Sequence, residues 1–155
     1  MENGSVDLRV RGVSMEDDEP IVILEDRVTD RRLLVPVGPF EASAIILELE
    51  GISPPRPLTH DLLAEIFEEG GFLLDAAELF GDLTSGTRAR LSYRKGLRKF
   101  EKEVRPSDAI ALALRLGSVL RADSALLAGR GSGGAAWRRP RILGLDEWKA
   151  KALRA

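Results

Sequence analysis

The chain has 155 residues, 44% hydrophobic and 31% charged, and this composition is typical of a single globular domain that buries its own core. It contains no cysteine and one histidine, which excludes disulfides, thiolate nucleophiles, zinc fingers and every site that needs two histidines, while the net charge of −2 indicates no particular partner. The first residues show no signal-peptide pattern and no apolar run approaches the roughly 20 residues of a membrane span, so we expect a cytoplasmic protein with no membrane partner.

Three strands are predicted at the start of the chain. Residues 6–10 alternate apolar and polar side chains, which is the pattern of a half-buried strand. After an acidic turn, residues 20–26 (PIVILED) form a nearly continuous apolar run, which predicts a strand buried on both faces. Residues 31–37 form the third strand, after a turn at Thr29-Asp30.

Two helices follow these strands. The first is predicted over residues 39–50, because proline is favoured at a first helical position and Gly51 at the end. The prolines of residues 52–58 lack amide donors, so this segment is expected to be a stiff surface loop. A second helix is predicted over residues 59–69, with Thr59 as its N-cap.

The remaining part of the domain repeats the strand pattern. Residues 72–80 are ambiguous between helix and strand, and their position favours a strand. Residues 87–94 and 97–104 are typical of a hairpin with a Lys-Gly turn. A helix is predicted over residues 106–117, and residues 118–127 are either a short strand and turn or a small last helix.

The C-terminal part has a different composition. Residues 128–140 are rich in glycine and are predicted to be a flexible linker. The end of the chain is mostly basic and can form a short helix with Trp148 as an anchor. We therefore predict a domain over residues 1–128 and a Gly-rich linker with a basic tail over residues 129–155.

Two helices of the chain share one plan. Aligned without gaps, residues 37–49 and 104–116 match a proline with a proline, Glu41 with Asp108, and several alanines and leucines with each other. In both, the acid lies on the free amides of the first turn. Each helix closes a unit of three strands, so we predict an α+β fold with a mostly antiparallel sheet, built from two duplicated units of three strands plus helices.

The predicted hairpin is strongly basic. Residues 86–105 contain eight Lys and Arg and two Glu, a local charge of +6. Arg88, Arg90 and Arg94 share one strand face, and such a row can follow a phosphate backbone. We expect single-strand binding with little sequence preference, because the chain has few aromatics to stack on bases. The alternative is a solvated face neutralised by acids, from residues 16–19 or from a neighbouring subunit.

Five further residues are candidates for chemistry. His60 lies at the start of a predicted helix, where it can act as a general base or acid, or is simply a surface residue in a first turn. Four carboxylates lie at predicted helix starts or strand ends, and two that converge could hold Mg²⁺ or Mn²⁺; the alternative for each is a helix cap. These are Glu25, Glu41, Asp61 and Asp108.

Three stretches resemble the bifunctional nuclease family. They are residues 37–51, residues 54–71 and residues 104–117, and their order and spacing also match that family. The segment Arg56-Pro57-Leu58-Thr59-His60-Asp61 and the segment Arg105-Pro106-Ser107-Asp108-Ala109-Ile110-Ala111-Leu112-Ala113 reproduce two family motifs in full. The resemblance covers roughly residues 6–128, and the family takes its name from members that degrade both RNA and DNA.

This resemblance leads to the hypothesis of a nuclease that hydrolyses RNA or DNA phosphodiester bonds with a divalent ion, Mg²⁺ or Mn²⁺. Guanidinium groups suit phosphate because they bind it in a bidentate way. The expected catalytic residues are His60, Asp61 and Asp108; the expected phosphate contacts are Arg56, Arg105, Arg88, Arg90 and Arg94; and the expected metal ligands are Glu41, Asp61 and Asp108.

A second hypothesis is a non-catalytic nucleic-acid-binding or oligomeric assembly module with the same fold, in which the two Arg-Pro motifs staple loops. We also expect a homo-oligomer. Residues 42–51 and 109–117 carry more apolar surface than a small sheet obviously covers, and exposed patches of that kind usually meet a partner.

Overall fold

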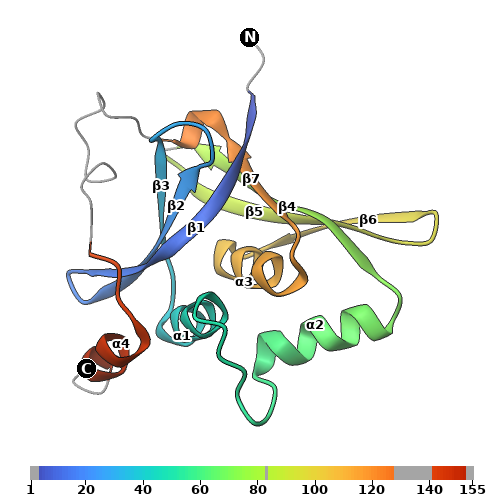
Figure 1. Cartoon of the computed structure of the whole chain (residues 1–155). Helices are drawn as coiled ribbons and strands as arrows, with labels where there is room; N and C mark the ends of the chain where they lie inside the picture. The colour runs from blue at the N-terminus through green and yellow to red at the C-terminus, as the bar shows by residue number, and fades with distance from the viewer. Residues whose placement is uncertain (1–3, 83, 128–140, 153–155) are drawn as a thin grey trace.

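The computed structural model describes residues 4–82, 84–127 and 141–152. Its fold is α+β, as predicted: a seven-stranded sheet, antiparallel except for one parallel pair, with strand order β3-β2-β1-β7-β4-β5-β6. The helices lie together on one face of this sheet (Figure 1). No helix within the described ranges is long and apolar enough to cross a membrane.

The first unit consists of β1 (Ser5–Glu16), β2 (Glu19–Asp26), β3 (Arg32–Pro36) and α1 (Pro39–Leu49). β2 is buried over nearly its whole length, as its apolar run predicts. β1 is longer than the predicted residues 6–10, because a register shift between Val10 and Gly12 interrupts the alternation of apolar and polar residues.

The second unit consists of β4 (Leu73–Asp82), β5 (Gly86–Lys95), β6 (Arg98–Val104) and α3 (Pro106–Leu116). The predicted strand before the hairpin and the hairpin itself are both confirmed. The segment after α3 is a strand, β7 (Val119–Asp123), and a short 3₁₀ turn, which is the first of the two alternatives. α2 (Thr59–Glu69) lies between the units, and its N-cap is Leu58 rather than the predicted Thr59.

The arrangement of the strands agrees with the predicted duplication. Each unit has three antiparallel strands followed by a helix, and the strand order is symmetric about β7. β7 runs antiparallel to β1 and parallel to β4, so the first strands of the two units run in opposite directions. A two-fold axis normal to the sheet produces this relation, and it also leaves α1 and α3 side by side on the same face, where they contact each other.

The core lies between the sheet and these two helices. Ile45, Ile46 and Ile110 are almost completely buried, and so is each of residues 109–113. Burial of one such branched side chain contributes about 1.5–3 kcal/mol before conformational entropy is counted. The expectation that α1 and α3 would present an exposed apolar surface is therefore wrong: the alanines let both helices lie close to the sheet, which covers their apolar faces.

The C-terminal segment packs on the first unit. In α4 (Leu145–Ala152), Trp148 is buried and its Nε1–H donates to Ser43 Oγ on α1 at 2.7 Å. The backbone N–H of Leu143 donates to the carbonyl of Val13 on β1 at 2.8 Å. Trp148 thus holds this segment to the body of the molecule. The predicted linker at residues 128–140 lies outside the described residues, and the domain boundary near residue 128 stays a prediction.

Candidate active site

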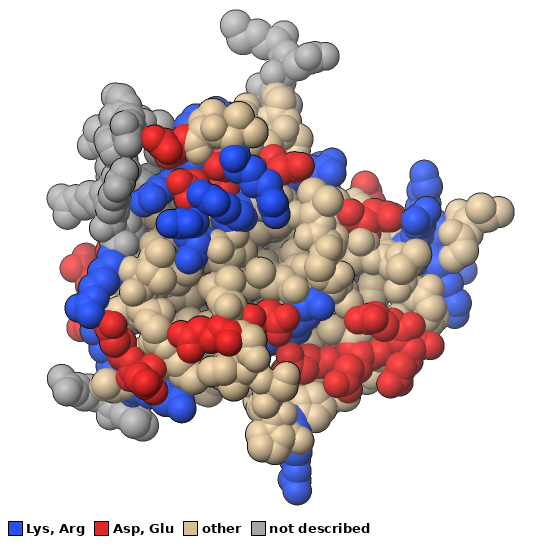
Figure 2. Space-filling view, in the orientation of Figure 1, with Lys and Arg blue, Asp and Glu red and all other residues tan. Residues whose placement is uncertain are grey.

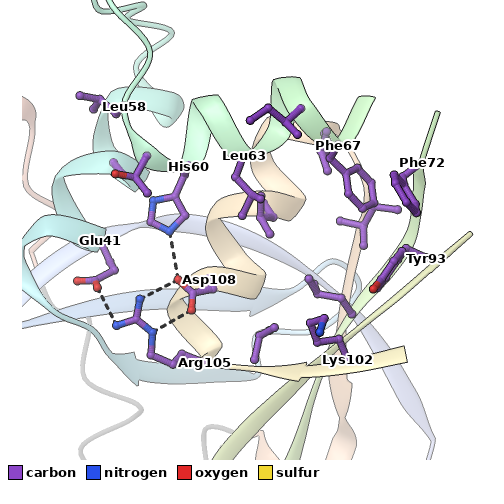
Figure 3. A pocket seen from close by; sticks show the side chains of 18 of the residues that line it. Glu41, Leu58, His60, Leu63, Phe67, Phe72, Tyr93, Lys102, Arg105 and Asp108 are labelled. Atoms are coloured by element: carbon purple, nitrogen blue, oxygen red, sulfur yellow. Dashed lines mark hydrogen bonds and ion pairs between the residues drawn. The ribbon is translucent and has the colours of Figure 1, made fainter. Parts of the chain in front are cut away.

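A groove of about 1130 Å³ separates α2 from the β5–β6 hairpin, with α3 along its floor. Half-buried aromatic rings from α2, from the loop that precedes β4 and from the hairpin line one end of it, with neighbouring ring centroids 5.2–6.0 Å apart. These rings are Phe67, Phe72, Tyr93 and Phe100. The other end of the groove is polar (Figure 3). The sequence has few aromatic residues, as noted above, but four of its six Phe and Tyr residues lie together here, which the sequence did not predict.

A histidine and an aspartate from the two family-like motifs meet at the polar end. His60 is the second residue of α2 and Asp108 the third residue of α3, and the N-termini of these helices face each other. His60 Nε2 lies 3.2 Å from Asp108 Oδ1, although 48 residues separate them in the chain. Sequence alone proposed these two residues separately; the packing of α2 on α3 makes them a pair.

Arg105 joins this pair to α1. Its Nε and Nη2 donate to the two carboxylate oxygens of Asp108 at 2.8 and 2.9 Å, and its Nη1 lies 3.0 Å from Glu41 Oε1. The Arg105 side chain keeps 65% of its surface exposed, whereas both acids are largely covered. The guanidinium is therefore held in place by two carboxylates and still faces solvent.

The electrostatics keep Asp108 ionised. Burial raises the pKa of this carboxyl, but the hydrogen bonds from Arg105 and His60 outweigh burial, and the pKa lies below its ordinary value. The same hydrogen bonds to Asp108, followed by its charge, raise the pKa of Arg105, and Glu41 adds to the effect. An ionised Asp108 can accept a hydrogen bond from Nε2–H of His60, which orients the imidazole ring.

Glu41, His60, Arg105 and Asp108 form one cluster, and it lies in a part of the chain that resembles known proteins. The family model described as the bifunctional nuclease domain matches residues 22–132, which include all four residues of the cluster. The chain belongs to the bifunctional nuclease domain family. The resemblance of the three stretches is thereby confirmed, and a nuclease-related role follows from it.

Two relatives of this bifunctional nuclease domain protein come from Mycobacterium tuberculosis, one from strain CDC 1551 / Oshkosh and one from strain H37Rv. Each is 37% identical over 128 residues, which cover 81% of this chain and 76% of the relative. Both are described as uncharacterized proteins, so they add no activity.

Asp61, the neighbour of His60, faces away from the cluster. Its Oδ1 accepts a hydrogen bond from Arg115 Nε at 2.6 Å, and its Oδ2 accepts one from the backbone N–H of Leu58 at 3.0 Å. Burial raises the pKa of Asp61, but these hydrogen bonds and the charge of Arg115 lower it below its ordinary value overall. The structure thus ties Asp61 to the start of α2 and not to the other predicted metal ligands.

Sequence reasoning missed Arg115. Its side chain is 5% exposed, and its two Nη groups donate to the carbonyls of Ala111 and Ala44 at 3.1 Å each, while its Nε reaches Asp61. One guanidinium therefore connects α1, α2 and α3. A signal was present, because Arg115 lies seven residues after Asp108 and hence on the same face of a helix that is otherwise apolar.

The remaining predicted arginines lie outside the cluster. Arg56 is exposed in the loop before α2 and forms no hydrogen bond or ion pair with any described residue. The row on β5 occupies the helix-free face of the sheet, opposite the groove, because Ala89, Leu91 and Tyr93 on the other face of the strand pack in or against the core. Each member of the row pairs with an acid: Arg88 with Glu103, Arg90 with Glu78 and Arg94 with Asp75, at 2.8, 2.8 and 3.2 Å.

The predicted alternative of neutralisation by acids thus describes this hairpin face, but the acids come from β4 and β6 and not from residues 16–19. Glu25, the fourth candidate carboxylate, also lies far from the groove in the hydrogen-bonding order of the sheet. It is buried on β2 and pairs with Arg9 and Arg11 at 3.3 and 3.0 Å.

The side chains of the cluster do not form a site for a divalent ion. Within the described ranges, no three His, Asp or Glu side chains come together as a metal site. Glu41 and Asp108 converge on the guanidinium of Arg105, which takes the place that a cation between them would need. Mg²⁺ and Mn²⁺ require several converging oxygen ligands, so the side chains as placed do not fit one. Metal dependence stays a prediction.

Proposed function

We propose that this chain hydrolyses phosphodiester bonds of RNA or DNA at the His60 end of the groove. The family supports a nuclease-related role. The observation that carries the proposal is the contact of 3.2 Å between His60 Nε2 and Asp108 Oδ1, because it joins two sequence motifs into one acid–base pair at the edge of a groove.

The pair provides a base for the reaction. When Nε2–H donates to Asp108, the other ring nitrogen, Nδ1, carries the free lone pair. Nδ1 takes the proton from a water molecule or a ribose 2′-hydroxyl, and that oxygen forms a bond to phosphorus. The bond from phosphorus to the leaving oxygen breaks, and the imidazolium gives its proton to the leaving oxygen. Proton transfer of this kind contributes about 10²–10⁴-fold to a rate.

Arg105 provides the phosphate contact. Three of its five N–H groups face Asp108 and Glu41, and because the side chain is exposed, a phosphate oxygen can accept a hydrogen bond from the others. Lys102, an exposed residue that also lines the groove, adds a second positive charge. Arg56 is the third candidate, since it forms no interaction within the described chain and lies four residues before His60.

The experiment uses purified protein and end-labelled single-stranded and duplex RNA and DNA, with Mg²⁺, with Mn²⁺ and with EDTA. We expect His60→Ala and Asp108→Asn to reduce cleavage by about 100-fold or more, a loss much larger than any change in the fraction of folded protein at the assay temperature. The matched control is Asp75→Asn, which breaks an acid–arginine pair on the opposite face and should cleave like the wild type. Wild-type cleavage no faster than that of His60→Ala, under every metal condition, sinks the proposal.

A second candidate is a non-catalytic binding module, and one observation favours it. Arg105 already neutralises both Asp108 and Glu41, as a guanidinium that staples two helix N-termini would. In that case His60→Ala and Asp108→Asn lower the melting temperature, and neither the wild type nor any variant shows measurable cleavage. The two measurements on the same two variants separate the candidates.

A further inference from the structure

The apolar face of α2 is largely uncovered. Leu62, Leu63 and Ile66 keep 47%, 48% and 56% of their surface exposed, and Ala64 is the one buried residue of this helix. A surface helix of a globular domain normally buries such an apolar stripe. Here the stripe borders the aromatic end of the groove, so the exposed apolar surface continues from α2 into the groove.

Opposite charges flank this surface. The exposed acids of α2 form no ion pair with any described residue; they are Glu65, Glu68 and Glu69. Across the groove, the hairpin tip carries Lys95 and Arg98 on the groove face, and neither has an acidic partner among the described residues. Figure 2 shows the two groups on one face of the molecule, with acidic residues over α2 and basic residues at the end of the hairpin.

The position of the acids is unfavourable for an isolated helix. Glu68 and Glu69 lie in the last turn of α2, which has no basic residue, and negative charge is disfavoured at this end by the helix dipole. On the other side, Lys95 and Arg98 lie over the rings of Phe72 and Phe100 at 5.3 and 5.1 Å, so these cations border the aromatic end of the groove. The acids of α2 and the cations of the hairpin tip therefore border the same apolar surface.

We propose that a second copy of this chain covers this surface, with α2 of each copy against the groove and the hairpin tip of the other. A two-fold axis brings the same patch of both copies together. The acids of one α2 then face the cations of the partner's hairpin tip, and the reverse contact forms at the same time. Leu62, Leu63 and Ile66 meet the aromatic end of the partner's groove.

The charges favour a second copy over a nucleic acid at this surface. A phosphate backbone would pair with the hairpin tip but would lie beside the three acids of α2, which repel it. A second copy pairs both groups at once. The His60–Asp108 pair lies at the other end of the groove from Phe67 and Phe72 (Figure 3), so this interface and the proposed catalysis are tested separately.

The test measures the mass of the full chain by light scattering and sedimentation over a range of concentrations. We expect twice the chain mass of 17.0 kDa for the wild type. Two variants reverse the charges: Glu65→Lys with Glu68→Lys and Glu69→Lys, and Lys95→Glu with Arg98→Glu. Each alone should be monomeric, because both contacts of its dimer bring like charges together. Lysines near the C-terminus of α2 interact favourably with the helix dipole, so the acid-to-lysine variant should keep this helix folded. A monomeric mass for that variant therefore reports a lost interface and not an unfolded helix.

Mixing the two charge-reversal variants gives the deciding measurement. In the mixed dimer one contact is native and the other is reversed in both partners, so a mass of two chains should return. Ile66→Glu should also give the monomer, while the control Val28→Glu, at an exposed apolar residue in the β2–β3 loop, should not. A wild-type mass near 17.0 kDa at every concentration overturns the proposal, as do a dimer unaffected by both charge-reversal variants and a mixture that stays monomeric. Nucleic-acid binding by a monomeric wild type that the hairpin variant abolishes also overturns it and assigns the surface to nucleic acid.

Discussion

The two repeated units start their helices in the same way and contribute differently to the site. In both α1 and α3 a proline is the first helical residue and an acid follows two positions later. These acids are Glu41 and Asp108, and both reach one guanidinium, that of Arg105. The residue that corresponds to Arg105 in the first unit is Gly38, which has no side chain to offer. Each unit thus provides a carboxylate, and one unit provides the cation between them.

The local geometry at Gly38 accounts for part of this difference. The Glu41 side chain folds back over Gly38, and a Cβ at that position would meet the Glu41 carboxylate. In the second unit the shorter Asp108 leaves space for the Arg105 side chain at the same position. A duplicated helix start thus becomes a candidate site where one residue, Arg105 in place of Gly38, departs from the symmetry.

A second departure lies near the ends of the same helices. Arg115 on α3 corresponds to Glu48 on α1 in the gapless alignment. Arg115 is buried and connects three helices, whereas the Glu48 side chain is partly exposed and forms no ion pair with the described residues. The second unit therefore holds α2, and with it His60, through a residue that the first unit lacks.

The largest effect should come from this second difference. Arg115→Met leaves the Asp61 carboxylate without its cation inside the structure, and we expect a loss of about 3 kcal/mol in the free energy of unfolding. The matched control, Glu48→Met, changes the corresponding residue of α1 and should alter stability by less than about 0.5 kcal/mol. Urea unfolding measures both. Equal losses in the two variants would mean that Arg115 has no special role in holding α2.

The next effect concerns Arg105. Arg105→Gly makes the second unit like the first, so Glu41 and Asp108 lose their shared cation and the substrate loses a phosphate contact. We expect nuclease activity to fall by about 10–100-fold, and Arg105→Lys to lie in between because lysine keeps the charge without the bidentate geometry. Cleavage assays measure both, with Arg27→Gly in the β2–β3 loop as the control. Unchanged cleavage in Arg105→Gly would remove Arg105 from the site.

A smaller effect should appear in acid. The folded-state pKa values of Asp61 and Asp108 lie below the ordinary value of 3.8, so their ion pairs contribute stability above that pH and lose it as the pH falls through the lowered values. We expect Asp61→Asn to be less stable than the wild type at neutral pH and the difference to narrow below about pH 4. Thermal unfolding between neutral pH and pH 3 tests this. A difference that stays constant in acid would show that the charge of Asp61 does not matter.

The smallest effect is expected from the arginine row of β5. Arg90 and Arg94 are paired with acids on the face that carries no helix, and exposed ion pairs of this kind contribute about 0.2–1 kcal/mol. Reversal of both to Glu should change the salt dependence of single-strand binding by less than about one unit of slope. Fluorescence polarisation with a labelled oligonucleotide measures it. A larger loss of slope would support the prediction that this row follows a phosphate backbone.

Local patterns in the sequence determined most of the secondary structure and the family. Hydrophobic alternation, prolines at helix starts and glycines at helix ends act within a few residues, so the predicted strands and helices are largely those observed. β1 was predicted too short because a bulge at Gly12 depends on the pairing with β2, which no local pattern shows. The duplication was visible because both units repeat one pattern of residue types at one spacing.

Tertiary structure decided which of the candidate residues meet. His60 and Asp108 were proposed separately, and only the packing of α2 on α3 brings them within 3.2 Å. The same packing turns Asp61 toward Arg115, and strand pairing places an acid beside each arginine of the β5 row. A charge in a sequence has no fixed partner, because its pairing depends on distances between segments far apart in the chain. The sequence by itself therefore determined the elements and the residue types of the site, while the fold decided which charges remain free to act.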